Sequence, residues 1–311
     1  MRVLVTGASG FIGHVTCARL VERGHEVRAL VRRPGSEPAG TVAVAGDLVD
    51  PVGLAAAVAE AAPEGVLHLA AEIAAQRDAD RLREVNVEGT RRLLEACAAL
   101  DRPVGADPLR FVFASTVVTG DAHGALLTPG GFLPVQTAYG RTKQEGERLV
   151  LASGLRASVV RPSHVYGGGG WYAQEILTRL RGPGRLSVIG RGDNWWDVVH
   201  VDDVAAALAL ALEEAPDGAI YHCADDAPIT QRDFVALSAE ALGVGRPRSI
   251  PAPLARLVAG SGPVDAVLRS ARSSNRLLRD ELGWSPVYPS AREGVPVAVA
   301  AAIAAGAVAA S

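Results

Sequence analysis

Short apolar runs alternate with longer helical stretches over the first half of the chain. Runs rich in β-branched residues predict buried strands at residues 2–6, 25–31, 41–45, 65–69, 110–114 and 157–161. Helical periodicity follows the first strand as far as Arg23 and returns over residues 51–62, 78–100 and 138–153. Strands that alternate with helices predict an α/β protein built on a doubly wound parallel sheet.

A glycine-rich turn joins the first strand to the first helix. Its glycines, Gly7, Gly10 and Gly13, have the spacing G-x-x-G-x-x-G. Glycines at such places permit a tight turn, let backbone amides approach a pyrophosphate and let the helix pack close to the strand. The helix N-terminus adds partial positive charge beside the phosphates. The pattern predicts a dinucleotide site of Rossmann-like type; the alternative is a turn with a purely structural role.

The end of the second strand bears on the choice of dinucleotide. NAD sites usually place an acidic residue there to bind the ribose 2′-hydroxyl, whereas an arginine accommodates the 2′-phosphate of NADP. The chain has Val31, Arg32 and Arg33 at this point, with no carboxylate among them. We therefore expect NADP (NADPH) rather than NAD. The alternative is that the two arginines are ordinary surface residues.

Candidate acid/base groups lie on the helix expected over residues 138–153. Tyr139 and Lys143 are four residues apart, so their side chains share one helix face. An ammonium beside a phenol favours the phenolate, and the pKa of Tyr139 is expected to fall from about 10 toward working pH. Ser115 and Thr116 follow the strand at 110–114, at the sheet edge where open α/β folds bind ligands.

Taken in order, these motifs resemble the short-chain dehydrogenase/reductase superfamily. More narrowly, the chain resembles the extended branch that holds NAD(P)-dependent epimerases, dehydratases and ketoreductases, and it is closer to the ketoreductases than to the nucleotide-sugar enzymes. Further segments that agree with this branch are residues 46–48, 68–71, 86–90, 161–167 and 199–205. Each segment is a loose match by itself, but the whole set occurs in one order along the entire chain.

The resemblance implies a role for each catalytic candidate. Tyr139 would protonate or deprotonate the reacting oxygen, while Lys143 would lower the pKa of Tyr139 and bind the nicotinamide ribose. A serine or threonine hydroxyl would assist them. Counting from the strand aligns Thr116 with that hydroxyl, whereas counting back from Gly120 aligns Ser115, so both remain candidates and we favour Ser115.

The cofactor contacts follow the same resemblance. The glycine turn contributes Gly7, Ser9, Gly10, Phe11, Ile12 and Gly13; the groove contributes Arg32, Arg33, Asp47, Leu48, Leu69, Ala70, Ala71 and Asn86; the nicotinamide end contributes Tyr139, Lys143, Pro162, Ser163, His164 and Val165. The hydride chemistry would belong to the cofactor, and the protein would supply position and charge.

Departures from the family pattern narrow the reaction. Val117 and Val118 stand where dehydratases carry an acidic pair, which argues against dehydration. Tryptophan replaces the arginine that nucleotide-sugar epimerases usually carry before the segment at residues 201–203. The leading hypothesis is an NADPH-dependent ketoreductase or alcohol dehydrogenase that acts on a small carbonyl or alcohol substrate. The alternatives are a sugar or nucleotide-sugar epimerase with tightly bound NAD(P), and a non-catalytic dinucleotide-binding sensor.

The substrate site is expected in a second, smaller α/β lobe. We assign residues 1–161 plus 201–224 to the dinucleotide-binding domain and residues 162–200 plus 225–311 to the substrate lobe. Its candidate substrate contacts are His164, Trp171, Tyr172 and Trp196, although the aromatic residues could equally fill the core of a small lobe. A helix over residues 204–212 is expected to begin after an N-cap at Asp202 and Asp203.

The composition limits the expected partners and compartment but adds no catalytic residues. A net charge of −3 gives no reason to expect nucleic acid or an anionic membrane as a partner. Cys17, Cys97 and Cys223 lie far apart without metal-ligand spacing, which fits buried thiols in a reducing compartment. The uncharged tail at residues 294–311 is mostly alanine, so we expect a packed terminal helix rather than a membrane anchor. We expect a cytoplasmic protein, and the resemblance allows a homodimer through the helices at 78–100 and 138–153.

Overall fold

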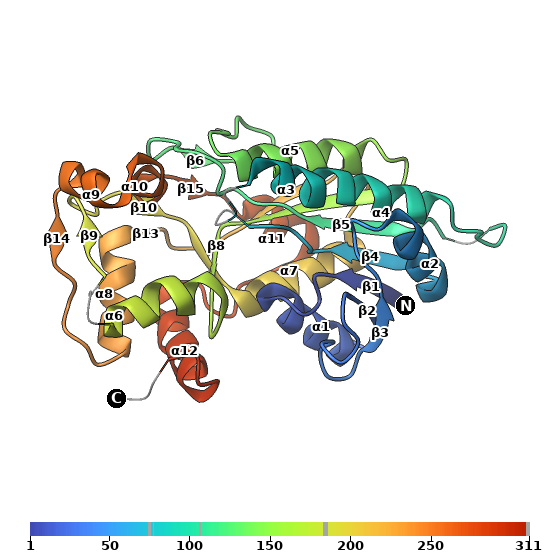
Figure 1. Cartoon of the computed structure of the whole chain (residues 1–311), viewed down its shortest axis with the longest axis horizontal. Helices are drawn as coiled ribbons and strands as arrows, with labels where there is room; N and C mark the ends of the chain where they lie inside the picture. The colour runs from blue at the N-terminus through green and yellow to red at the C-terminus, as the bar shows by residue number, and fades with distance from the viewer. Residues whose placement is uncertain (74–75, 77, 106, 183–185, 309–311) are drawn as a thin grey trace.

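A seven-stranded parallel sheet forms the centre of the larger part of the molecule. The computed structural model describes residues 1–73, 76, 78–105, 107–182 and 186–308 (Figure 1). The sheet strands are β1 (Arg2–Thr6), β2 (Glu26–Val31), β3 (Val42–Ala45), β4 (Gly65–His68), β5 (Arg110–Ala114), β7 (Arg156–Pro162) and β12 (Ile220–Cys223). Their order is β3-β2-β1-β4-β5-β7-β12, and every neighbouring pair is parallel. The doubly wound Rossmann-like sheet expected from the sequence is therefore confirmed.

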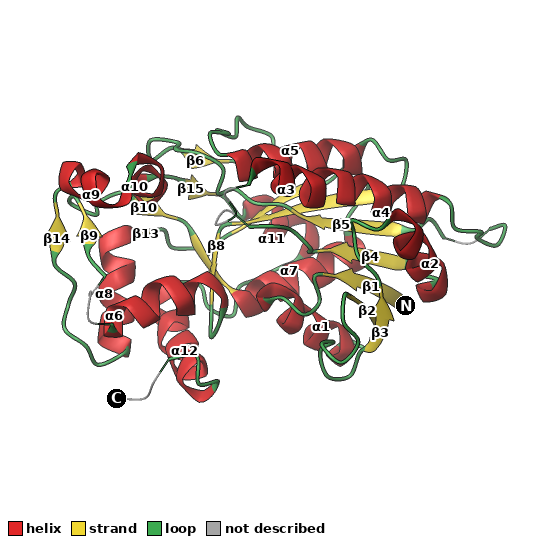
Figure 2. Ribbon diagram, in the orientation of Figure 1, coloured by secondary structure: helices red, strands yellow, loops and turns green. Residues whose placement is uncertain are grey.

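Helices cover both faces of this sheet (Figures 1 and 2). One face packs against α1 (Phe11–Glu22), α7 (Val201–Glu214) and α11 (Arg276–Leu282). The other packs against α2 (Pro51–Ala61), α4 (Gly89–Ala98) and α5 (Ala138–Leu151). Because successive strand residues point to opposite faces, Val3 and Val5 enter the first core while Leu4 enters the second.

The helix expected over residues 78–100 is divided. It consists of α3 (Ala79–Arg83), a π-helical turn at Glu84–Glu88 and α4. The extra residue in a π turn shifts the register of the side chains that follow it. Hydrophobic periodicity does not reveal this shift, since Val85 within the turn and Leu93 after it are buried in the same core.

The cap of α7 also differs from expectation. The helix begins at Val201, and the His200 side chain accepts the N–H of Asp202 at 3.3 Å. Asp203 lies in the first turn, where it is fully buried and accepts the backbone amides of Val287 (2.6 Å) and Tyr288 (3.1 Å). The assignment of Asp202 and Asp203 as the N-cap is therefore wrong, because Asp203 instead ties α7 to the C-terminal segment.

The smaller part of the molecule contains four two-stranded sheets. These pair β8 (His164–Tyr166) with β11 (Val198–His200), β10 (Trp195–Trp196) with β13 (Ile229–Thr230), β9 (Val188–Ile189) with β14 (Ser249–Ile250), and β6 (Leu126–Leu127) with β15 (Arg272–Ser273). Its helices are a π-helical turn at Tyr172–Leu177, α6 (Thr178–Arg181), α8 (Gln231–Ala241), α9 (Ala252–Ala259), α10 (Ser261–Leu268) and α12 (Ala291–Ala304). The β6–β15 pair joins the loop after β5 to this part of the fold.

The alanine-rich C-terminal region forms α12, which packs against α8. Its buried face includes Val295, Ala298, Val299 and Ala302. Among the described residues, no helix has both the length and the apolar character needed to cross a bilayer.

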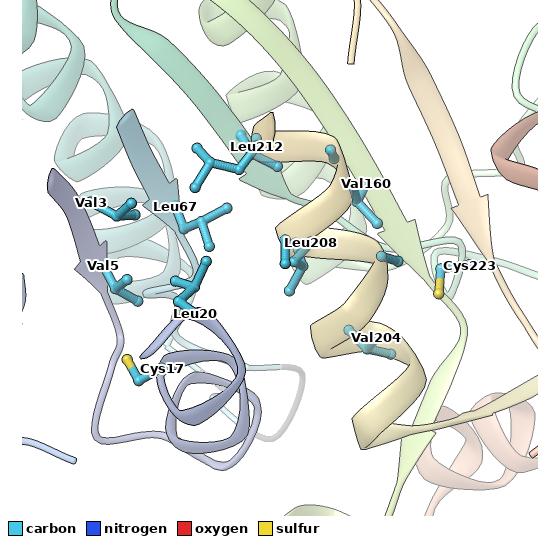
Figure 3. Packing of buried hydrophobic residues seen from close by; sticks show 14 of the residues in the cluster. Val3, Val5, Cys17, Leu20, Leu67, Val160, Val204, Leu208, Leu212 and Cys223 are labelled. Carbon is cyan, nitrogen blue, oxygen red and sulfur yellow. The ribbon is translucent and has the colours of Figure 1, made fainter. Parts of the chain in front are cut away.

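Leu208→Ala should test the packing of α7. Leu208 is fully buried in the cluster that α7 forms with α1 and the sheet (Figure 3). Removing its side-chain carbons should lower the free energy of unfolding by about 2–5 kcal/mol, through lost burial and a residual cavity. Urea denaturation measures the change, with the exposed Leu257→Ala as a matched control that should change stability by less than about 0.5 kcal/mol. Equal losses in the two variants would contradict the assigned packing.

Candidate active site

The glycine turn brings two backbones into contact at the carboxyl ends of β1 and β4. Gly7 has φ +69°, and a Cβ placed there would lie 2.7 Å from the backbone nitrogen of Ala70. A Cβ at Gly13 would overlap the carbonyl oxygen of Gly7. Gly10 then begins α1 without any side-chain cap. The first-turn amides of α1 are therefore available to an anion such as a pyrophosphate.

A buried hydrogen-bonded chain holds this turn in place. Thr6 Oγ1 accepts the N–H of Ala70 at 3.1 Å and lies 2.6 Å from His68 Nδ1. His68 Nε2 lies 2.9 Å from Thr90 Oγ1, which donates to the carbonyl of Asn86. Because that hydroxyl hydrogen is already engaged, His68 carries its proton on Nε2 and accepts from Thr6 at Nδ1. Burial, and secondarily Lys143, lowers the pKa of His68 to about 3, so the imidazole is neutral.

The Asn86 side chain hydrogen-bonds to neighbouring segments of the protein. It is almost fully buried, its Oδ1 accepts the Glu72 amide at 2.8 Å, and its Nδ2 donates to the Glu72 carbonyl and to Thr142 Oγ1, each at 3.0 Å. Both polar atoms are therefore engaged within the protein. The Asn86 side chain thus supports the loop after β4 and α5, and the cofactor contact expected from the sequence stays a prediction.

The adenosine end of the expected groove is open and positively charged. Arg32 and Arg33 follow β2 with exposed side chains. The loop after β3 is ordered by Asp47, whose Oδ1 accepts the Val49 amide at 3.2 Å, while Leu48 is buried below it. These features fit a dinucleotide that lies across the carboxyl ends of the strands, where the sheet order reverses between β1 and β4.

Tyr139 and Lys143 share one face of α5. Thr137 caps this helix by accepting the Gly140 amide at 2.9 Å. Lys143 is buried, and its Nζ lies 4.1 Å from the centre of the Phe113 ring. Lys143 is also the single lysine of the chain, every other basic side chain with a permanent charge being arginine. A compact ammonium can shift its pKa when buried, whereas a guanidinium cannot.

The pKa values of this pair differ from expectation. Burial raises the pKa of Tyr139 to about 12 and lowers the pKa of Lys143 to about 7, the latter partly offset by Glu147. The expected fall in the pKa of Tyr139 is therefore wrong for this structure. Withdrawal from water disfavours the charged form of both groups, phenolate and ammonium alike, and this effect outweighs their attraction.

The two candidate hydroxyls after β5 differ in their partners. Thr116 Oγ1 donates to the Pro162 carbonyl at 3.3 Å and accepts the Val118 amide at 2.9 Å, so both of these hydrogen bonds stabilise the loop itself. Ser115 is also buried, but its Oγ has no hydrogen-bond partner. A buried hydroxyl without a partner costs about 1–3 kcal/mol, which a ligand oxygen beside it would recover.

The segment after β7 carries a second orphan hydroxyl and a fixed imidazole. Ser163 is buried, and its Oγ has no partner. His164 is partly exposed, with its Nδ1 3.0 Å from the Asp197 carbonyl and its ring stacked on Trp196 at 5.3 Å between centroids. Since Nδ1 donates to that carbonyl, Nε2 is the nitrogen available to a substrate.

The aromatic candidates form a core rather than an open pocket. Tyr172 is fully buried and bonds Ser238 Oγ through its hydroxyl at 2.9 Å. Trp196 is only 5% exposed, and its Nε1 donates to the Val267 carbonyl at 3.1 Å. Trp171 is partly exposed and donates to the Val165 carbonyl at 2.7 Å. Tyr172 therefore lies in the core, Trp196 supports the His164 ring, and the substrate contacts expected of both stay predictions.

Sequence reasoning missed a clamp on the loop that carries Ser115. Arg269 is buried and donates to the carbonyls of Gly120 (2.7 Å) and Val117 (2.9 Å) and to Asp197 Oδ1 (3.1 Å). Although burial alone would raise it, the pKa of the Asp197 carboxyl is held well below its usual range by Arg269 and by hydrogen bonds from His164 and Ser273. No local signal marks Arg269, because its partners are far away in sequence.

Comparisons with known proteins agree with this geometry. Residues 3–224 match a family described as the NAD dependent epimerase/dehydratase family. The chain is 34% identical to a 3-diazoavenalumate denitrifying reductase of a Streptomyces species, over 95% of this chain and 99% of the relative. It is 33% identical to a 2-alkyl-3-oxoalkanoate reductase of Stenotrophomonas maltophilia, over 79% and 77% respectively. The fold is similar to that of MoeE5, solved with UDP-glucuronic acid and NAD, with TM-score 0.80, 27% identity and coverage of 98% and 100%.

Gly7→Ala should weaken dinucleotide binding. The new methyl group would sit against Ala70 and force the turn away from the strand ends, so we expect the Kd for NADPH or NADH to rise at least about tenfold, or 1.4 kcal/mol. Gly24→Ala is the matched control, because Gly24 has φ +80° but nothing within 4 Å of its Cβ position. Both variants carry backbone strain of about 1–2 kcal/mol. Fluorescence titration of each should show weakened binding in the first alone, and equal affinities would contradict the assigned turn.

Proposed function

Because the chain belongs to the NAD dependent epimerase/dehydratase family, we propose that it is an NADPH-dependent reductase of carbonyl compounds. The chain is an NAD(P)-dependent oxidoreductase of that family. Carbonyl reduction is supported by a set of groups at the strand ends. These are a buried hydroxyl without a partner on Ser115, a tyrosine that is protonated at neutral pH, and the single lysine beneath it.

The residues of the glycine turn and groove fit a bound dinucleotide. Gly7 and Gly13 allow the close backbone contacts that form the turn, since a Cβ at either would collide with backbone atoms, and the uncapped N-terminus of α1 would supply amides to a pyrophosphate. Lys143 would bind the nicotinamide ribose. When bound, the reduced cofactor supplies the hydride.

Tyr139 is the proton donor in this proposal. Since its pKa is about 12, the phenol is protonated throughout the neutral range and can give its proton to a developing alkoxide. The Ser115 hydroxyl donates a hydrogen bond to the same oxygen and stabilises the charge that forms there. Lys143, when protonated, stabilises the phenolate left on Tyr139. This arrangement favours reduction of a carbonyl over oxidation of an alcohol at neutral pH.

The preference for NADPH rests on the arginines after β2. Arg32 and Arg33 are exposed there, and no acidic residue follows Val31 to bind a ribose 2′-hydroxyl. A 2′-phosphate would gain charge-assisted hydrogen bonds from either guanidinium. MoeE5, by contrast, was solved with NAD.

Epimerisation of a nucleotide sugar is the second candidate. The likeness to MoeE5, which holds UDP-glucuronic acid in its structure, covers nearly the whole chain and favours it. Against it stands Trp196, a buried side chain at the place where the family pattern has an arginine for the diphosphate. Both relatives are reductases, and the 2-alkyl-3-oxoalkanoate reductase supports the first candidate because its name gives a 3-oxo acid as substrate.

A steady-state assay tests the proposal directly. With NADPH and NADH over a panel of 3-oxo acids, aryl ketones and quinones, we expect turnover with NADPH at the higher kcat/KM. Tyr139→Phe should lower kcat by about 10²–10⁴-fold, because the general acid is lost while the ring packing stays. The Kd for NADPH should remain close to that of the wild type. Epimerisation of a UDP-sugar with no turnover of any carbonyl would establish the second candidate instead.

Ser115→Ala and Thr116→Val separate the two hydroxyls. Loss of the Ser115 hydroxyl should lower kcat by about 10²–10³-fold with little loss of stability, since that group has no partner to abandon. Loss of the Thr116 hydroxyl should instead lower the free energy of unfolding by about 1–3 kcal/mol, because the Val118 amide and the Pro162 carbonyl would be left unpaired. Kinetics and urea denaturation on both variants measure this, and the reverse pattern would assign catalysis to Thr116.

A further inference from the structure

A buried carboxylate lies one helical turn beyond Lys143. Tyr139, Lys143 and Glu147 are spaced i, i+4 and i+8 along α5, so their side chains form one stripe. Glu147 is only 4% exposed and Lys143 only 2%. Burying an isolated carboxylate costs several kcal/mol, so Glu147 requires a partner.

That partner is Arg161 on β7, not Lys143. The Arg161 Nε donates to Glu147 Oε1 at 2.8 Å, and Nη2 donates to Oε2 at 2.6 Å. The remaining nitrogen, Nη1, is 3.4 Å from His222 Nε2 on the neighbouring strand β12 and 3.5 Å from the Pro129 carbonyl. A two-pronged contact of this kind fixes the carboxylate in one orientation. Both oxygens of Glu147 are thus directed at the guanidinium.

This geometry leaves the ammonium of Lys143 under the field of a carboxylate that does not bond to it. The charged and titratable groups around Lys143 are Tyr139 and Glu147 on α5 and His68 on β4, and β5 presents only the Phe113 ring. Tyr139 and His68 are neutral near pH 7, so Glu147 supplies the negative charge. Its attraction favours the protonated amine and opposes the effect of burial.

A buried ion pair of this kind is weak evidence for stability. Replacement of such a pair by apolar residues is often neutral or stabilising. An apolar pair in the place of Glu147 and Arg161 could fill the same space, but it would remove the negative charge from beneath Lys143. Packing alone therefore does not explain why a carboxylate is buried at Glu147.

We propose that Glu147, held in place by Arg161, is a positioning residue that increases the fraction of Lys143 that is protonated at neutral pH while leaving its ammonium free for Tyr139 and the nicotinamide ribose. This inference rests on the proposed function of Tyr139 and Lys143 in reduction. It gives the two residues different roles. Glu147 supplies a negative charge near Lys143, and Arg161 binds both carboxylate oxygens so that Glu147 does not form an ion pair with Lys143.

Two variants should then shift the pKa of Lys143 in opposite directions. In Glu147→Gln combined with Arg161→Met, the carboxylate and its cation are both absent, and Lys143 should lose its proton at a pH lower by about one unit. In Arg161→Met alone, Glu147 is released to pair with Lys143, which should keep its proton to a higher pH than in the wild type. The double variant leaves no buried charge unpaired, so it remains informative if Arg161→Met fails to fold.

The single lysine makes a direct measurement possible. Protein labelled with ¹³C-lysine gives one ε-methylene signal, and its pH titration by NMR reports the ionisation of Lys143 without any substrate or turnover. Glu145→Gln is the matched control, because Glu145 lies on the same helix but forms an exposed ion pair with Arg83. Its titration should overlay that of the wild type.

Activity provides the second readout. In the double variant, kcat for carbonyl reduction should begin to fall at a lower pH than in the wild type, since the lysine is lost as a cation earlier. Arg161→Met should lower kcat by about tenfold or more at every pH, and adding Glu147→Gln should recover part of that loss. The same Lys143 titration in all variants, or no recovery in the double variant, would overturn the inference. Absence of reductase activity in the wild type would instead contradict the proposed function and leave the titration result intact.

Discussion

Direct contact between the backbones of Gly7 and Ala70 is the constraint from which the rest of the site is built. No side chain fits between them, so β1 and β4 end close enough for a pyrophosphate to meet both. Thr6 fixes Ala70, His68 fixes Thr6, and the chain continues through Thr90 to Asn86. Asn86 then bonds Thr142, the residue before Lys143. The cofactor turn and the acid/base helix therefore belong to one hydrogen-bonded unit, and a shift in either moves the other.

Burial sets the ionisation of Tyr139 and Lys143 in this unit. A chain with many arginines carries its one lysine at the place where a cation must be compact and able to shift its pKa. The same withdrawal from water that lowers the pKa of Lys143 raises the pKa of Tyr139. A phenol that holds its proton at neutral pH is a donor rather than a base, which supports the proposed direction of reduction.

The sequence was sufficient to predict six of the seven strands of the sheet, but not β12. The candidate site residues next to the strand ends stay predictions. Strand Arg2–Thr6 was predicted to the residue, because a β-branched run followed by a glycine turn has few other solutions. The burial of Tyr172 could not be predicted, since an aromatic residue has the same pattern in a core as in a pocket. Arg269 and Arg161 escaped notice for another reason. Their partners lie on other elements, and only the folded chain brings a guanidinium to the Val117 carbonyl or to Glu147.

Hydrogen-bond satisfaction distinguishes the reacting surface from its support. Trp171, Trp196 and Tyr172 all engage their polar atoms within the protein, as core residues do. The hydroxyls of Ser115 and Ser163 are as deeply buried but have no partner, although Thr116 beside them is satisfied. Each orphan hydroxyl costs stability of about 1–3 kcal/mol. In the proposed reduction, a carbonyl oxygen beside such a hydroxyl would recover that cost, and the recovery would be larger for the alkoxide that hydride transfer produces. The unsatisfied groups would then bind the product-like state better than the ground state, which is the condition for catalysis.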